Sequence, residues 1–333
     1  MGPLFERGEK VKKFLILILL IFIPFRSGDA KEISPEEMYK QRMDLYKKTE
    51  VVSGVPWYFI AAIDQYERSI RHVRKDLPKP DGLTGFYMDA THWSGPLNPD
   101  KGDHNPLTID FFSGKGRDGN GDGKASRTDD EDLLYTAASL ISLYGVNDTS
   151  VRIALWNYYK RDKTVSAIMA NAKIYRTFNR INLDEKAFPI PKEYNYTYHN
   201  TWGDRRGWGG RRMHEGTDIF ASYGTPVRAV RHGVVELKGW NKYGGWRVGI
   251  RDLHNTYHYY AHLNGFAKDL KIGDVVKAGQ VIGSVGSSGY GPPGTSGKFP
   301  PHLHFGMYKD NGINEWAFDP YPHLKAWERA EKT

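Results

Sequence analysis

Two histidines, His302 and His304, have a spacing that is typical of metal ligands on a β-strand. Residues two positions apart in a strand point to the same face, so both imidazoles can reach one site while Leu303 packs behind them. The pair alone is a weak signal, because such pairs also arise by chance. A second pair, His214 and Asp218, is also an even number of residues apart and could share the face of another strand. The four side chains together predict a metal site.

Two imidazoles and one carboxylate form a ligand set that catalytic zinc uses, since they leave the fourth position open for water. Zinc bound in this way lowers the pKa of water to about 7 and polarises a carbonyl group. Hydrolysis of an amide bond also needs proton transfer and a donor that stabilises the oxyanion. Histidine, with an ordinary pKa of about 6.5, suits both tasks. These residue types therefore predict a zinc hydrolase.

The C-terminal half of the chain resembles peptidase family M23, the lysostaphin-like or LytM-like peptidoglycan endopeptidases. Six segments occur in the family's order, at residues 214–219, 224–227, 260–263, 273–276, 279–283 and 302–305. The resemblance implies that His214, Asp218 and His304 bind zinc. It also implies that His262 and His302 are catalytic histidines beside the metal, and it leaves open which one is the base.

Other residues of this half are candidates for the walls of the site. His258 would share the face of His262 in a regular strand and could line the site. Aromatic side chains could contact alanine methyl groups or sugar faces, although each could equally belong to the core; they are Trp240, Tyr243, Trp246 and Tyr290. The glycine-rich loop 286–297 is too long for a hairpin turn and is expected to form one wall of a substrate groove.

Sequence patterns divide the chain into two folded domains. The expected segments are a signal peptide at 1–30, a helical domain at 31–187, a linker and entry strand at 188–212, a β-rich peptidase domain at 213–325 and a tail at 326–333. Strand-like runs separated by glycine-containing turns lie at 225–231, 233–238, 246–252, 256–263, 281–285 and 302–308. We therefore predict an α+β protein with an all-α first domain and an antiparallel β-rich second domain.

The helical domain resembles the lysozyme-like lytic transglycosylase fold, in which a glutamate ends a helix that begins near the motif VPxxxIAAI. Glu67 occupies that position. The adjacent Arg68 favours the ionised carboxylate and would lower its pKa, the wrong direction for a general acid. We expect a wall-recognition or packing domain in which Glu67 ends a helix and forms a surface ion pair. Glycan cleavage by Glu67 is the alternative.

A calcium-type loop lies within the helical domain. Oxygen ligands at loop positions one, three and five, glycine at six, a backbone carbonyl at seven and an acid at twelve correspond to Asp118, Asn120, Asp122, Gly123, Lys124 and Asp129. The twelfth position has Asp where Glu is usual, which shortens this ligand by one methylene. The sequence predicts calcium binding, and a glycine-rich turn without metal is the alternative.

The N-terminus and the charge indicate export to the cell wall. Lysines at 10, 12 and 13 precede the apolar run 14–23, which is too short to span a bilayer comfortably, and small residues follow at 28–30. A cleaved signal peptide is predicted, and an uncleaved anchor, the only expected membrane contact, is the alternative. The chain has no cysteine and a net charge of +8. Its basic residues are scattered without a nucleic-acid motif, so carboxylate-bearing peptidoglycan is the expected partner.

The order of signal, helical domain and M23 domain resembles that of sporulation peptidases that cut the stem peptide between L-Ala and D-Glu. The resemblance implies a zinc metalloendopeptidase that acts on peptidoglycan in the cell wall or spore cortex. Three alternatives remain open: cleavage of another stem or cross-bridge bond, an additional transglycosylase activity, and an inactive domain that serves as a scaffold or activator of wall hydrolases. The presence of all five site residues argues against the inactive domain.

Overall fold

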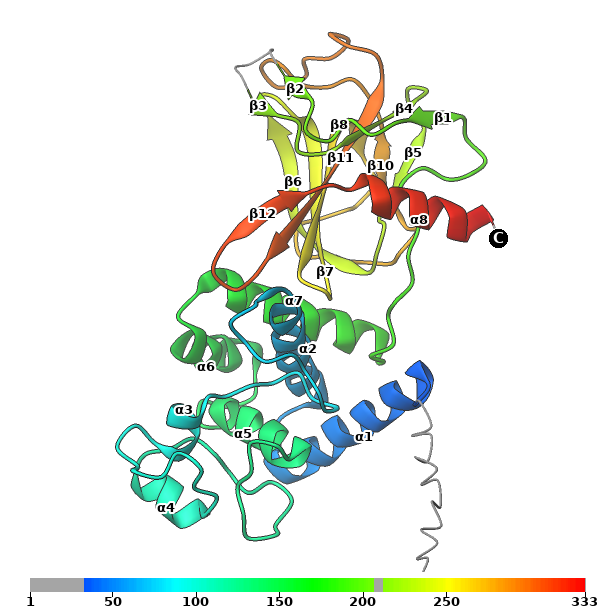
Figure 1. Cartoon of the computed structure of the whole chain (residues 1–333). Coiled ribbons are helices and arrows are strands. Elements are labelled where there is room, and N and C mark those ends of the chain that lie inside the picture. Colours follow the sequence, from blue (N-terminus) through cyan, green and yellow to red (C-terminus); the bar gives the residue numbers. More distant parts are fainter. Residues whose placement is uncertain (1–32, 207–211, 333) are drawn as a thin grey trace, which may run out of the picture. The chain divides into compact units, whose positions relative to one another are not determined.

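The computed structural model describes residues 33–206 and 212–332, which form a helical part followed by a β-rich part (Figure 1). This order confirms the predicted α+β class. The predicted signal segment, residues 1–30, lies outside the described residues. Within the described part, no helix has both the length and the apolar character needed to cross a bilayer.

The helical part is built around α2. Its helices are α1 (Pro35–Ser53), α2 (Trp57–Val73), α3 (Ala90–Ser94), α4 (Pro106–Phe111), α5 (Asp130–Ser142), α6 (Asp148–Tyr159) and α7 (Asp162–Phe178). Apolar residues at helical spacing bury α2 against α1, α5 and α7. Two helices have polar N-cap residues. The side chains of Asp129 and Asn147 accept hydrogen bonds from backbone N–H groups in the first turns of α5 and α6.

A buried ionic cluster fixes α1 to α2. Asp64 of α2 lies 3.3 Å from Arg42 and 3.6 Å from Arg68, and it accepts a hydrogen bond of 2.6 Å from Tyr46. Burial alone would raise the pKa of Asp64, but the two arginines, together with hydrogen bonds from Tyr46 and the Gly85 N–H, lower it. The side chain of Asp64 is therefore an ionised structural carboxylate.

The β-rich part contains one large antiparallel sheet. Its strands are β1 (Tyr196–Tyr198), β4 (Thr217–Ala221), β5 (Pro226–Arg228), β6 (Gly233–Asn241), β7 (Gly245–Asp252), β8 (Thr256–Phe266), β9 (Val275–Val276), β10 (Val281–Val285), β11 (His302–Asp310) and β12 (Glu315–Phe318). The main order is β1-β4-β11-β8-β7-β6-β9, while β10 pairs with β5 and β8, and β12 with β11. A separate small sheet joins β2 (Arg205–Arg206) to β3 (Arg212–Met213).

The six predicted strand regions are confirmed, with changes at their ends. The region predicted at 225–231 is strand only over Pro226–Arg228, whereas β6 and β8 extend further than predicted. A helix that the sequence did not predict, α8 (Tyr321–Lys332), spans most of the predicted tail. Leu324 and Trp327 of this helix are buried in the core of the β-rich part, so the segment packs as an integral element.

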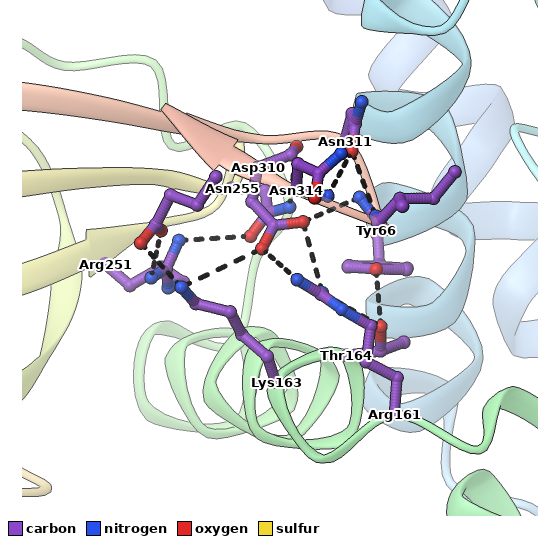
Figure 2. A network of polar contacts seen from close by, with 12 residues as sticks. Tyr66, Arg161, Lys163, Thr164, Arg251, Asn255, Asp310, Asn311 and Asn314 are labelled. Atoms are coloured by element: carbon purple, nitrogen blue, oxygen red, sulfur yellow. Dashed lines mark hydrogen bonds and ion pairs between the residues drawn. The ribbon is translucent and has the colours of Figure 1, made fainter. Parts of the chain in front are cut away.

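The end of β11 contacts the helical part through a polar network (Figure 2). Asp310 has a fully buried side chain, and its two carboxylate oxygens accept hydrogen bonds of 3.1 and 2.6 Å from Arg161. Lys163 lies 3.9 Å from the same carboxylate and 2.6 Å from Glu315. The hydroxyl of Tyr66 in α2 lies 2.7 Å from that of Thr164. The two hydrogen bonds from Arg161 to Asp310 restrict the geometry of this contact more than a single ion pair would.

We predict that Asp310→Ala lowers the free energy of unfolding by about 3 to 5 kcal/mol, because it leaves the Arg161 guanidinium without its carboxylate. The matched control is Arg176→Ala, which removes an ion pair with Asp148 whose side chains are 46% and 55% exposed. That loss should be about 1 kcal/mol or less. Urea denaturation of both variants measures the difference, and equal losses would contradict a structural role for the Asp310 network.

Candidate metal centre and active site

Three side chains from different segments converge on one point. His214 lies in the loop between β3 and β4, Asp218 lies on β4, and His304 lies on β11 directly opposite Asp218 in the strand pair. The Nε2 atom of His214 is 2.8 Å from Nδ1 of His304, and each nitrogen is 3.1 Å from Oδ1 of Asp218. Nitrogen ligands at zinc bond lengths in a tetrahedron lie about 3.3 Å apart. The three atoms therefore fit a zinc ion with little rearrangement.

The protonation of this cluster suits a cation. His214 donates its Nδ1 proton to the Thr201 carbonyl at 2.6 Å, which leaves the Nε2 lone pair facing the other two ligands. Burial lowers the pKa of His304, which favours its neutral imidazole. Burial alone would raise the pKa of Asp218, but its contacts with His214, His304 and His302 hold it well below its usual value. Metal ligands must be deprotonated in this way. Among the described residues, these three form the group that meets the distance requirement for a metal site.

Gly216 lets the His214 loop approach β11. A Cβ atom added at this glycine would lie 2.6 Å from Cε1 of His304 and 2.7 Å from the carbonyl oxygen of Phe305. No side chain fits there without moving the ligand. The expectation that His214 and Asp218 share one strand is wrong, because β4 begins only at Thr217 and His214 reaches the site from the preceding loop.

His262 and His302 lie beside the three ligands, as predicted. Their ring centroids are 4.9 Å apart, and Nε2 of His302 is 3.8 Å from Oδ1 of Asp218. Each ring places its Nδ1 atom 2.8 Å from a backbone carbonyl, that of Ser288 for His262 and that of Pro300 for His302. These contacts fix the Nδ1–H tautomer and leave Nε2 for chemistry. Burial lowers the pKa of His262 to about 3, and the neighbouring histidines add to the shift.

The backbone of His262 is left-handed, with φ of 61°. In a regular strand His258, Tyr260 and His262 would all face the core. The left-handed conformation, held by a hydrogen bond of 2.8 Å from the His262 N–H to the Gly244 carbonyl, turns His262 towards the metal site instead. The expectation that His258 shares its face is therefore wrong. His258 contacts Asp252 at 3.0 Å, in a pocket away from the ligands.

A pocket of about 490 Å³ opens beside the ligands. Its lining includes His214, His262 and His304, the charged residues Arg212, Glu215 and Arg247, and the tyrosines 243, 257, 259, 290 and 308. Tyr243 and Tyr290 were predicted as walls, and Tyr290 belongs to the predicted wall loop. Trp240 and Trp246 are absent from this lining; Trp246 packs against the core with Phe266 at 5.5 Å. The sequence analysis missed Arg247 and Tyr259, although alternation along their strands places them on the ligand face.

Comparison with known proteins agrees with this geometry. Residues 212–320 match a family model described as "Peptidase family M23". The chain is 58% identical to L-Ala--D-Glu endopeptidase of Bacillus subtilis (strain 168), over 95% of this chain and 96% of that protein. The chain belongs to peptidase family M23. Zinc is the metal on which peptidases of this family depend, and the His214-Asp218-His304 group supplies a fitting site.

Lysostaphin is a relative that covers a smaller share of this chain. Lysostaphin of Staphylococcus simulans is 40% identical over 34% of this chain and 22% of its own length. A solved structure of lysostaphin from the same organism is 34% identical and covers 43% of this chain and 55% of that chain, with a TM-score of 0.35. The match to the Bacillus subtilis protein, which covers 95% of this chain, includes both the helical and the β-rich part.

Glu67 has a different environment from the one predicted. It lies within α2, is 8% exposed, and its Oε1 accepts a hydrogen bond of 2.7 Å from the Tyr159 hydroxyl. Burial raises the pKa of Glu67 to about 7, although the Tyr159 hydrogen bond opposes the shift. Arg68 instead contacts Asp64 and the Leu83 carbonyl. The expectations of a lowered pKa and of a surface ion pair at a helix end are therefore wrong.

The calcium-type loop is held by its own hydrogen bonds. Asp118 accepts bonds of 2.7 and 2.8 Å from the N–H groups of Gly121 and Gly123. Asp122 accepts the Lys124 N–H at 2.8 Å, and Asp129 caps α5. These contacts are those of a glycine-rich turn and occupy some of the expected ligand oxygens. Calcium binding here stays a prediction.

We predict that replacing His214, Asp218 or His304 with Ala abolishes tight zinc binding, since each change removes one of three ligands. His302→Ala is the matched control, because it removes a neighbouring imidazole and leaves the ligand set complete. Elemental analysis of the purified variants measures zinc per chain. Full occupancy in all three ligand variants would contradict the assignment.

His262→Ala and His302→Ala should retain zinc but lose turnover. Proton transfer by a positioned side chain contributes about 10²- to 10⁴-fold to the rate. Release of peptides from purified peptidoglycan, measured alongside zinc content, separates this loss from metal loss. A His302→Ala variant with near-wild-type hydrolysis would remove that residue from the mechanism.

Proposed function

We propose that this chain is a zinc metalloendopeptidase that hydrolyses the bond between L-Ala and D-Glu in the stem peptide of peptidoglycan. The observation that carries the proposal is the 58% identity, across both parts of the chain, to a protein named for that bond. The His-Asp-His group and two adjacent histidines beside an open pocket support a working hydrolase. They argue against a purely scaffolding role.

The site residues have separate tasks in this proposal. His214, Asp218 and His304 would hold the zinc, which supplies Lewis acidity for the scissile carbonyl and the attacking water. His302 and His262 are oriented through their Nδ1 contacts, so each offers an Nε2 lone pair that can accept a proton from water. Once Nε2 is protonated, the same ring can donate a hydrogen bond to the oxyanion. The lowered pKa of His262 keeps this ring neutral before reaction. Either ring can be the base.

The place of action follows from the proposed substrate. Peptidoglycan lies outside the cytoplasmic membrane, so we propose export through residues 1–30 and action in the cell wall or spore cortex, during sporulation. N-terminal sequencing of the exported protein tests the segment: a start at residue 31 supports a cleaved signal peptide. An intact N-terminus in the membrane fraction supports the anchor.

Calcium binding at residues 118–129 is proposed as a structural role in the helical part. The loop spacing supports it, and a cation that binds only the folded state raises the unfolding temperature with its concentration. Thermal unfolding with added calcium should therefore show a rise that is lost in the double variant Asp118→Ala, Asp122→Ala. An equal rise in that variant would contradict the proposal.

Glycan cleavage at Glu67 is a second candidate function. The observation that favours it is the buried carboxyl with a pKa of about 7, because a general acid must be protonated near neutral pH. A lytic transglycosylase leaves 1,6-anhydromuramic ends, which mass spectrometry of digested wall detects. Anhydro products that disappear in Glu67→Gln, while peptide cleavage continues, would establish the activity. Their absence from the wild-type digest would leave Glu67 as a structural residue.

The proposed bond predicts specific products. Digested peptidoglycan should show new amino termini at D-Glu and single L-Ala residues on muramic acid, which mass spectrometry of the muropeptides identifies. The Asp218→Ala variant, which lacks a ligand, is the control and should release none. New termini at D-Ala or in a cross-bridge would discard the bond but keep the zinc peptidase.

A further inference from the structure

Arg247 lies on the pocket face of the sheet. Its neighbours Val248 and Ile250 are buried in the core, and side chains alternate along a strand, so Arg247 of β7 points to the opposite face. Arg247 lines the pocket that contains the metal ligands. A permanently charged guanidinium therefore forms part of the substrate-facing surface.

This arginine lacks the carboxylate partners that a second arginine on the same strand face has. Arg251, four residues further along β7, contacts Glu236 at 2.8 Å and Glu315 at 3.0 Å. Arg247 has no ion pair with a carboxylate among the described residues, and its buried Nε atom has no hydrogen-bond acceptor there. A buried charged donor without an acceptor is costly. The difference between the two arginines indicates that Arg247 is held for a ligand.

Arg247 is close to the metal centre. The ring of Tyr259 lies edge-on to the ring of His304, with centroids 5.9 Å apart. The charge of the Arg247 guanidinium and its hydrogen bond to the Tyr259 hydroxyl oppose the rise that burial causes in the pKa of that hydroxyl. Gly244 leaves room for this tyrosine, because an added Cβ would lie 2.4 Å from its hydroxyl oxygen. Tyr259 thus bridges a metal ligand and Arg247.

The other charged side chains of the pocket already have partners. Arg212 donates a hydrogen bond of 2.8 Å to the Tyr290 hydroxyl, and its guanidinium lies 5.3 Å from the ring centroid of Tyr243. Glu215 accepts a hydrogen bond of 3.3 Å from Tyr308. Among these side chains, Arg247 is the one with a buried nitrogen that has no acceptor among the described residues, so an anionic group that enters the pocket would pair with this guanidinium.

We propose that Arg247 determines specificity by binding the free carboxylate of the D-Glu residue beside the scissile bond. This inference rests on the proposed function. A glutamyl residue uses its amine and one carboxyl group to link to its neighbours, so its second carboxyl group stays available as an anion. The planar guanidinium can hold a carboxylate through two parallel hydrogen bonds. Glycine residues in a cross-bridge have no second carboxyl group. Recognition of this carboxylate by Arg247 would therefore distinguish stem-peptide substrates from glycine cross-bridges.

Two stem peptides that differ in one group test the assignment on the full-length zinc enzyme. One has the free D-Glu carboxylate and the other has a carboxamide there. Wild type should show a kcat/KM about 10- to 100-fold higher for the carboxylate, the range expected for a hydrogen bond to a charged group. In Arg247→Gln the carboxylate rate should fall by this factor while the carboxamide rate stays nearly constant. Arg212→Gln, the matched pocket control, should keep the wild-type ratio.

Each outcome bears on one of the two proposals. Equal loss on both peptides in Arg247→Gln, or a wild-type ratio near one, overturns the role of Arg247 while L-Ala–D-Glu cleavage stands. Wild-type cleavage at another bond, seen from the product masses alone, overturns the proposed function and this inference with it. Thermal unfolding checks that the variants fold. If Arg247→Gln does not fold, Arg247→Lys decides: it keeps the charge without the planar fork, so a reduced ratio supports the assignment and an unchanged one overturns it.

Discussion

The pairing of β4 with β11 is the constraint on which the site depends. This antiparallel register places Asp218 directly opposite His304, so a carboxylate and an imidazole face each other without any support from a flexible loop. A shift of one residue would send His302 and His304 into the core and Leu303 and Phe305 to the pocket, because side chains alternate along a strand. Burial of these two apolar residues in the core therefore also fixes the metal ligands in place.

The same strand connects the chemistry to the helical part. β11 carries His302 and His304 at one end and Asp310 at the other, where the carboxylate receives both arms of Arg161 (Figure 2). Each end of β11 lies beside a buried carboxylate in contact with particular side chains: Asp310 contacts Arg161, and Asp218 contacts the two histidine ligands. A single rigid element thus positions the catalytic residues and a contact with the helices.

Much of the site could be predicted from the sequence because its geometry is periodic or local. The His-x-His spacing places His302 and His304 on one face, and short motifs around Asp218 and His262 carry the family resemblance. The side-chain direction of His262 depends on one left-handed residue, which no periodic pattern shows, and this is why His258 was misplaced. The environment of Glu67 depends on Tyr159, 92 residues away in sequence. Arg68 is adjacent to Glu67 in sequence, but its side chain contacts Asp64. The expectation from sequence, a lowered pKa for Glu67, was therefore opposite to the raised pKa that the structure indicates.

The burial of the ligands has a consequence for the lifetime of the metal. His214 and Asp218 are each only 4% exposed. The backbone at Gly216 packs directly against His304, and Leu303 and Phe305 are buried on the core side of β11. Solvent reaches the ligands through the pocket that His214 and His304 line. Within the described residues, this pocket can therefore admit both an ion and a peptide to the ligands. A peptide that fills this pocket would cover the metal ligands, so a chelator should remove the metal more slowly from the enzyme–substrate complex than from the free enzyme.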